Sequence, residues 1–180
     1  MAKKTSTNRC VAFLRGINVG GNRKIDMGDL KKFFEKLKYQ NVSTILNTGN
    51  VIFETNESDM KRITEVLEAG LTKQFKYPAR VIVYDVSNVE KVIQSYPFDS
   101  NEADNQHYVV FLSSDIGKEL VKLLAVDKKL EEVALGDGVV YWKVAKGSTL
   151  KSNFGMLIAK AKYKEHNTVR NINTLRKVVR

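Results

Sequence analysis

The residues best suited to chemistry follow an apolar segment near the amino terminus, where glycines, an amide and cations crowd into one turn. The turn contains Arg15, Gly16, Asn18, Gly20 and Gly21, and Arg23 and Lys24 follow. Glycine adopts positive φ without steric cost and lets a ligand approach the backbone closely. Backbone N–H groups in such a turn can bind an anion, and nearby cations strengthen the attraction. The pattern predicts a phosphate or carboxylate site.

This turn does not match the common nucleotide-binding motifs. Gly16 and Gly21 have the spacing of a P-loop, but Asn22 and Arg23 stand where that motif needs Lys and Ser or Thr. The Gly-x-Gly-x-x-Gly motif of dinucleotide-binding proteins is absent from the sequence. The alternative interpretation is that the glycines only let the chain turn from a strand into a helix.

Two further polar clusters could contribute to an anion site. The first runs through Asn47, Thr48, Gly49 and Asn50, between two apolar segments. The second contains Arg170 and Asn171, and a guanidinium beside amides is suited to phosphate or carboxylate. Helix capping by Asn171 or Asn173 is the alternative for this second cluster, although capping does not explain Arg170. We predict that the two glycine turns lie at the same end of one sheet.

Charge is distributed unevenly along the 180 residues, whose formal net charge is +10. Residues 91–142 contain five basic and nine acidic side chains, whereas residues 143–180 contain ten basic and one acidic. A basic segment can attract nucleic acid or another polyanion, and it can equally be a solvated lysine surface. Tyr141, Trp142 and Tyr163 add aromatic rings that could stack on bases, although strands also need such rings for their cores.

Other kinds of site find little support. His107 opens a predicted strand, His166 lies in a polar loop where it could act as a base, and Cys10 stands in an apolar strand as a buried thiol. These three residues lie in different contexts, which argues against a metal site, and no cofactor is expected. The lone cysteine, the polar amino terminus and the lack of a long apolar run predict a cytoplasmic protein without membrane association.

Hydrophobic periodicity predicts the elements that must position these residues. In the first half, strands are expected over residues 10–15, 42–46, 51–54 and 79–84, and helices over 27–38 and 58–75. Asp26 and Ser58 are the predicted N-caps of these two helices. The resulting order, β-α-β-β-α-β, is that of a ferredoxin-like subdomain.

A second series of elements follows a short helix over residues 87–95. Strands are expected over residues 107–113, 131–135 and 139–144, and helices over 115–126, from Ser148 or Ser152 toward Tyr163, and over 174–179. This β-α-β-β-α order suggests an imperfect structural duplication. We therefore predict an α+β protein with two ferredoxin-like (β-α-β-β-α-β) subdomains, residues 1–95 and residues 96–180, the second with basic carboxyl-terminal helices. Each would have an antiparallel sheet with helices packed on one face.

Several of these motifs together resemble a known family. They are residues 13–21 (FLRGINVGG), Met27 and Leu30, residues 46–53 (LNTGNVIF), Trp142 and residues 168–174 (TVRNINT). The combination resembles DUF1697, a family of uncharacterised bacterial proteins, over nearly the whole chain. That family usually has Gln-Ser-Gly-Asn in the second turn and Thr-Thr-Arg-Asn-Trp near the carboxyl terminus, so positions 47, 48, 169 and 172 depart from its pattern. The resemblance implies a pair of ferredoxin-like subdomains and supplies no activity.

The sequence thus favours a binding module for an anionic ligand, which would be a nucleotide, a phosphorylated metabolite or single-stranded nucleic acid. Arg15 and Arg170 are expected to matter most, because they could hold one anion from opposite sides if the carboxyl-terminal segment folds back onto the first half. One alternative is an enzyme acting on a phosphorylated small molecule, with the arginines as electrostatic clamps and His166 as base. The other is a structural or protein-interaction domain without a small ligand. No particular oligomeric state is indicated.

Overall fold

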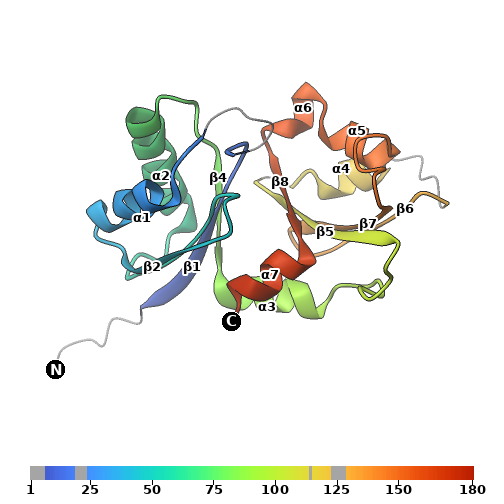
Figure 1. Ribbon diagram of the computed structural model, residues 1–180, viewed down its shortest axis with the longest axis horizontal. Helices are drawn as coiled ribbons and strands as arrows, with labels where there is room; N and C mark the ends of the chain where they lie inside the picture. The colour runs from blue at the N-terminus through green and yellow to red at the C-terminus, as the bar shows by residue number, and fades with distance from the viewer. Residues whose placement is uncertain (1–6, 19–23, 114, 123–128) are drawn as a thin grey trace. The chain divides into compact units, whose positions relative to one another are not determined.

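The computed structural model describes residues 7–18, 24–113, 115–122 and 129–180 (Figure 1). The chain divides into two compact units, one of Met1–Val89 with Lys177–Arg180 and one of Glu90–Arg176. Helix α3 (Val86–Gln94) contains the division between them, and the domain boundary that we propose, after residue 95, follows this helix directly. Each unit holds one four-stranded sheet in which all described pairs of strands are antiparallel.

The first unit has the predicted order of elements. They are β1 (Asn8–Leu14), α1 (Met27–Lys36), β2 (Gln40–Ile45), β3 (Asn50–Thr55), α2 (Met60–Phe75) and β4 (Val81–Asp85). The strands lie in the order β2-β3-β1-β4, which is the ferredoxin-like arrangement. Alternate residues of β1, Cys10, Ala12 and Leu14, join the apolar stripes of α1 and α2 in one buried cluster. The two helices therefore cover one face of this sheet (Figure 1).

One of the two predicted helix N-caps in this unit is confirmed and the other is wrong. Asp26 caps α1 as predicted, since its Oδ1 accepts hydrogen bonds from the N–H groups of Gly28 (2.8 Å) and Asp29 (3.0 Å). The cap of α2 is Asp59 and not Ser58: Asp59 Oδ1 accepts from the first turn of the helix. The carboxylate stands one residue nearer to the unpaired N–H groups, which it satisfies directly.

The second unit repeats the plan in full. Its elements are β5 (Asn105–Leu112), α4 (Gly117–Lys122), β6 (Glu131–Leu135), β7 (Val139–Ala145), α5 (Asn153–Ile158), α6 (Ala161–Lys164), β8 (Asn167–Asn171) and α7 (Ile172–Val178). The strand order β6-β7-β5-β8 matches that of the first sheet position by position. The fold class expected from the sequence, α+β with two ferredoxin-like subdomains, is confirmed. The end of the predicted helix over 115–126 lies outside the described residues.

Strand β8 corrects the prediction that the second series lacks its last strand. Its polar sequence reads as a capping segment, yet it pairs with β5 from Tyr108 opposite Asn171 to Leu112 opposite Asn167. The buried Asn167 side chain explains how a polar residue is tolerated there, since its Nδ2 donates to the carbonyls of Ile158 (3.0 Å) and Tyr163 (2.7 Å). These bonds also engage the ends of α5 and α6, which form two short helices where one was predicted.

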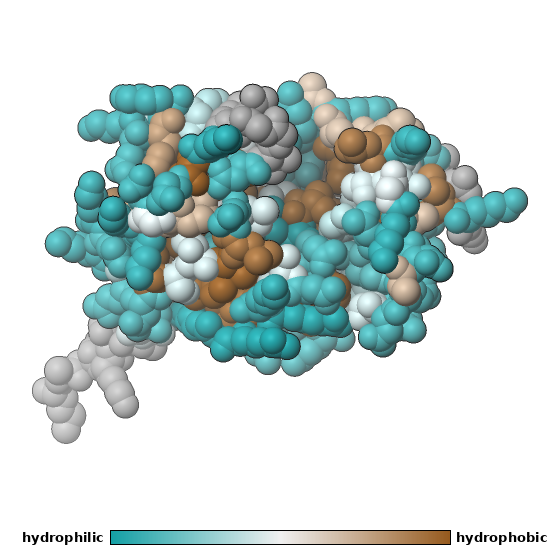
Figure 2. All heavy atoms as spheres, in the orientation of Figure 1, coloured by the Kyte–Doolittle hydropathy of each residue, from teal (hydrophilic) through white to brown (hydrophobic). Residues whose placement is uncertain are grey.

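The face of the molecule seen in Figure 2 is largely polar. Figure 2 shows hydrophilic side chains over most of the visible face, interrupted by smaller hydrophobic areas. The exposed large hydrophobic residues are Leu46, Val66, Leu135, Leu150 and Met156. None of the described helices is both long and apolar enough to cross a membrane.

Candidate functional site

The two glycine turns lie at the same end of the first sheet. Strand β1 ends beside the start of β3, where Phe13 is opposite Asn50, and β2 ends opposite the same residue at Ile45. The turn after β1 and the turn between β2 and β3 are therefore at one edge. The N–H of Leu14 donates to the carbonyl of Gly49 (2.8 Å), which ties the last residue of β1 to the second turn.

Asn18 joins the two turns through its side chain. Its Nδ2 donates to the carbonyls of Asn47 (2.9 Å) and Ile25 (3.0 Å), and its Oδ1 accepts from the N–H of Ile25 (2.8 Å). The backbone of Asn18 is left-handed, with φ of 54°, a conformation that asparagine tolerates better than most residues. The prediction that the turns share one end of one sheet is confirmed by these contacts.

Gly49 and Asn50 have clear roles in shaping the second turn. Gly49 is buried with φ of 72°, and a Cβ there would lie 2.8 Å from both Ile17 Cδ1 and Leu14 Cβ. Asn50 is fully buried, and its Nδ2 donates to the carbonyl of Ile45 (2.9 Å) and to Thr48 Oγ1 (3.0 Å). Among the predicted contact residues, solvent reaches Gly16 and Asn47 most freely, and Arg15 and Asn18 in part.

Cationic residues gather around the same end. The N–H of Arg15 donates to the carbonyl of Arg80 (2.9 Å), which places both arginines at the point where β1 ends and β4 begins. Arg80 Nη1 lies 3.8 Å from Glu68 Oε2, a long and partly exposed ion pair. Lys24 is exposed next to Ile25. Gly20 and Gly21, which the sequence also suggests as ligand contacts, and Arg23 lie outside the described residues.

Arg170 and Asn171 belong to the second unit. The Arg170 side chain is buried, and its Nη1 donates to Thr168 Oγ1 (2.7 Å) and to the carbonyl of Val169 (2.8 Å). Burial lowers the pKa of Arg170 to about 10. Asn171 Oδ1 accepts from the N–H of Asn173 (2.9 Å), the bond expected of a residue that caps α7. The joint grip of Arg15 and Arg170 on one anion stays a prediction.

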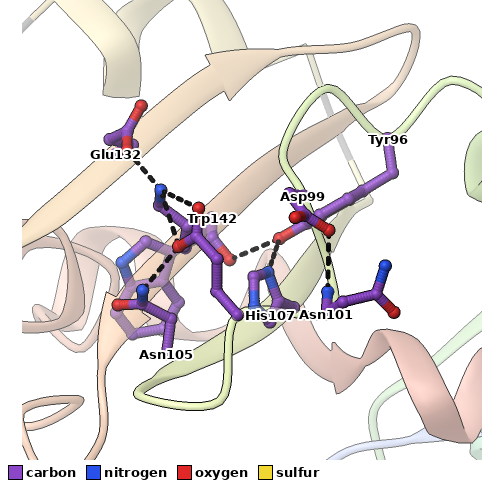
Figure 3. A network of polar contacts seen from close by, with 9 residues as sticks. Tyr96, Asp99, Asn101, Asn105, His107, Glu132 and Trp142 are labelled. Atoms are coloured by element: carbon purple, nitrogen blue, oxygen red, sulfur yellow. Dashed lines mark hydrogen bonds and ion pairs between the residues drawn. The ribbon is translucent and has the colours of Figure 1, made fainter.

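The histidines lie in separate settings within the second unit. His107 is buried, with Nδ1 3.1 Å from the hydroxyl of Tyr96, which also donates to the carbonyl of Trp142 (Figure 3). Within the described residues its Nε2 has no hydrogen-bond partner. Burial, with the nearby charge of Glu102, raises the pKa of Tyr96. His166 is exposed, with Nδ1 3.4 Å from Ser113 Oγ.

A buried glutamate that sequence reasoning missed supports Trp142. Glu131 is only 2% exposed, and its Oε2 accepts from the indole N–H of Trp142 (2.9 Å) while its Oε1 accepts from the N–H of Phe154 (2.9 Å). Trp142 therefore packs in the core, as the alternative to base stacking proposes. A signal existed in the sequence, because alternation along β6 puts Glu131 on the same face as Val133.

Cys10 is expected to be chemically inert in the folded protein. It is fully buried, and burial together with the carboxylate of Asp85, 3.9 Å from Sγ, raises the thiol pKa from 9.0 to about 12. Iodoacetamide at about pH 8 should therefore label Cys10 only after unfolding, measured by mass spectrometry with and without urea. Rapid labelling without urea would contradict the burial.

The raised pKa of Cys10 also affects stability. Between the two pKa values the unfolded chain releases a proton that the folded chain keeps, so this thiol lowers stability as the pH rises above about 9.

Across the described part of the chain, no three His, Cys, Asp or Glu side chains form a group that could bind a metal ion. The groups that lie at the end of the first sheet are backbone amides, side-chain amides and cations. Such groups recognise negative charge and hydrogen-bond acceptors.

Comparison with known proteins agrees with the fold. A conserved bacterial protein from Streptococcus pneumoniae, SP0830, has a structure with a TM-score of 0.80 at 21% identity, covering 97% of this chain and 98% of that one. An unknown protein from Galdieria sulphuraria, at 14% identity over 92% of this chain and 98% of its own, has a TM-score of 0.28, which supports no argument. No curated protein matches. The sequence model of a protein family of unknown function, DUF1697, matches residues 7–141, and the chain belongs to that family.

Proposed function

We propose that the protein is a binding module for a small anionic ligand, held at the end of the first sheet. The candidate ligands are a nucleotide, a phosphorylated metabolite and the backbone of a single-stranded nucleic acid. The observation that carries the proposal is the bond between Asn18 Nδ2 and the Asn47 carbonyl, because it holds two polar turns together at one place. A ligand could then contact both turns at once.

The charges around the joined turns favour an anion. Arg15 and Arg80 flank the junction of β1 and β4, and Lys24 lies on the chain that leads into α1. The first turn of α1 carries its own carboxylates, Asp26 and Asp29, and Asp26 already occupies the N–H groups there. The helix terminus is thus a poor anion site, and the loop and its cations are the better one.

The proposal predicts that Arg15→Gln weakens binding of inorganic pyrophosphate about tenfold. A charge-assisted contact of Arg with a phosphate is strong and often bidentate, and about 1.4 kcal/mol corresponds to that factor. Binding would be measured by titrating isotope-labelled protein and following the amide resonances of Gly16, Asn18 and Asn47. ATP, adenosine and a short single-stranded oligonucleotide, each at two salt concentrations, would separate phosphate recognition from base recognition.

Arg9→Gln is the matched control. Arg9 is exposed near the start of β1, whereas Arg15 directly follows the end of that strand, so the change removes the same charge without touching the turns. Arg9→Gln should leave pyrophosphate binding within about twofold of the unaltered protein, since distant exposed charges are screened by salt. Equal losses in both variants would mean that net charge alone attracts the ligand. If no probe changed the resonances of the turns, the proposal would be wrong and the turns would serve only the fold.

A further inference from the structure

The two sheets end in the same way, which allows their turns to be compared residue by residue. In the first, Asn50 lies opposite Phe13 of the central strand and follows Gly49, with φ of 72°. In the second, Val139 lies opposite Phe111 of the central strand and follows Gly138, with φ of 67°. The hairpin between β6 and β7 is thus the counterpart of the hairpin between β2 and β3.

The residues that follow the central strands correspond as well. The N–H of Arg15 donates to the carbonyl of Arg80 in the first unit, and the N–H of Ser113 donates to the carbonyl of His166 in the second, both at 2.9 Å. The positions of two arginines at one site are therefore taken by a serine and a histidine at the other. The Ser113 hydroxyl lies 3.4 Å from His166 Nδ1.

The end of the second sheet carries a cavity. In the first unit, buried Ile17 packs against the hairpin so closely that a Cβ on Gly49 would lie 2.8 Å from its Cδ1. At the corresponding end of the second unit there is a cavity of about 490 Å³. That volume is within the range of small-molecule sites, which is roughly 300–1,000 Å³.

The lining of this cavity combines an apolar wall with an excess of negative charge. Leu112, Leu135 and Val139 supply the apolar part, and Asp115, Asp137 and Lys118 supply the charges. Leu135 and all three charged residues of the lining are exposed. The charged side chains that line the cavity are two carboxylates and one ammonium, so the net charge of the lining favours a cation.

We propose that this cavity binds a small organic amine, with its ammonium group between Asp115 and Asp137 and its apolar part against Leu112 and Leu135. The protein then has two sites at equivalent positions of a duplicated fold, one for an anion and one for a cation. An amphipathic cation satisfies both parts of the lining, since it places apolar surface against leucine and charge beside carboxylate. Ser113 also lines the cavity, and its hydroxyl could contact a further polar group of the ligand.

The test is a titration of isotope-labelled full-length protein with n-propylammonium, with 1-propanol and propionate as neutral and anionic probes of similar size. Only the ammonium should shift the amide resonances of Ser113, Gly117 and Gly136 at low millimolar concentration, the affinity expected of so small a ligand. Asp115→Asn and Asp137→Asn should each weaken binding about fivefold, and Lys118→Gln should strengthen it, because a partly exposed charge contributes on this scale.

Asp104→Asn is the control, because Asp104 is an exposed aspartate of the same unit that precedes β5, at the opposite end of the sheet. It should bind the ammonium as the unaltered protein does. The amide spectra of all four variants without ligand should match that of the unaltered protein, which shows that each variant is folded. Three results would overturn the proposal: no shifts with n-propylammonium, equal shifts with 1-propanol, or preference for propionate that Lys118→Gln abolishes. None of these results bears on pyrophosphate binding in the first unit, so the two proposals fail separately.

Discussion

Glu131→Ala is expected to lower the free energy of unfolding by about 4 kcal/mol, the largest loss among the substitutions considered. Glu131 is buried and accepts from two donors that have no access to water, the indole N–H of Trp142 and the backbone N–H of Phe154. Alanine would leave both donors unsatisfied and open a cavity between β6, β7 and α5. Because Trp142 is the single tryptophan, its emission during urea unfolding measures the change at this point.

Two variants refine this result. Glu131→Gln keeps one acceptor but turns an N–H₂ group toward one of the donors, so about half the loss is expected. Glu132→Ala is the matched control, because Glu132 is the next residue of β6 and pairs with Lys143 on the exposed side of the strand. The Glu132 side chain is 47% exposed, and Lys143, 14% exposed, keeps its second partner Glu102 in the variant, so a loss of about 1 kcal/mol is expected. If Glu131→Ala and Glu132→Ala were equally stable, the two bonds of Glu131 would have no net value.

The sequence was sufficient for the fold because most elements carry their own local signals. The stripe of Leu30, Phe33 and Phe34 predicts α1, and Asp26 predicts where it begins. The Gly-Asp-Gly segment predicts the β6–β7 hairpin, and the N–H of Gly136 does donate to the carbonyl of Val139 (2.9 Å). Each of these signals involves residues close together in the chain.

The failures occurred where the deciding contact comes from far along the chain. The sequence does not predict strand β8, because Asn171 and Asn173 favour a capping segment, whereas the pairing partners of β8 lie on β5 and Asn167 bonds to the end of α5. Glu131 was missed because its value depends on Trp142 and Phe154, which are brought to it only by the folded sheet and helix. Intrinsic propensity gives no sign of such tertiary bonds.

The candidate sites show the same division. Glycine spacing and amide content located the turns of the first sheet, and the order of elements placed them at one end. The role of each residue could not be predicted from its type. Asn50 and Asn47 have the same side chain, yet Asn50 is fully buried within the hairpin and Asn47 is exposed. The cavity of the second unit carries no sequence motif, because its lining comes from two separate segments, residues 112–118 and 135–139, that only the folded chain brings together.

Asn18→Ala is expected to lower the free energy of unfolding by about 3 kcal/mol and to remove the response to pyrophosphate. The substitution deletes three hydrogen bonds, two to Ile25 and one to Asn47, each worth about 0.5–1.5 kcal/mol. It also puts alanine at φ of 54°, which adds roughly 1 kcal/mol of backbone strain. Asn18→Gly removes the bonds without the strain, so its loss should be smaller by about that amount.

Asn41→Gly is the control for this pair, because Asn41 is also left-handed, with φ of 49°, but its Nδ2 makes an exposed hydrogen bond to the Glu54 carboxylate (2.7 Å) and does not join the two turns. Asn41→Gly should change stability by less than about 1 kcal/mol and leave pyrophosphate binding intact. Asn18→Gly should bind pyrophosphate weakly even at temperatures where it is folded, since the two turns are no longer joined. A folded Asn18→Gly variant that binds as well as Asn41→Gly would show that the junction serves the fold alone, and the anion site would then have to lie elsewhere.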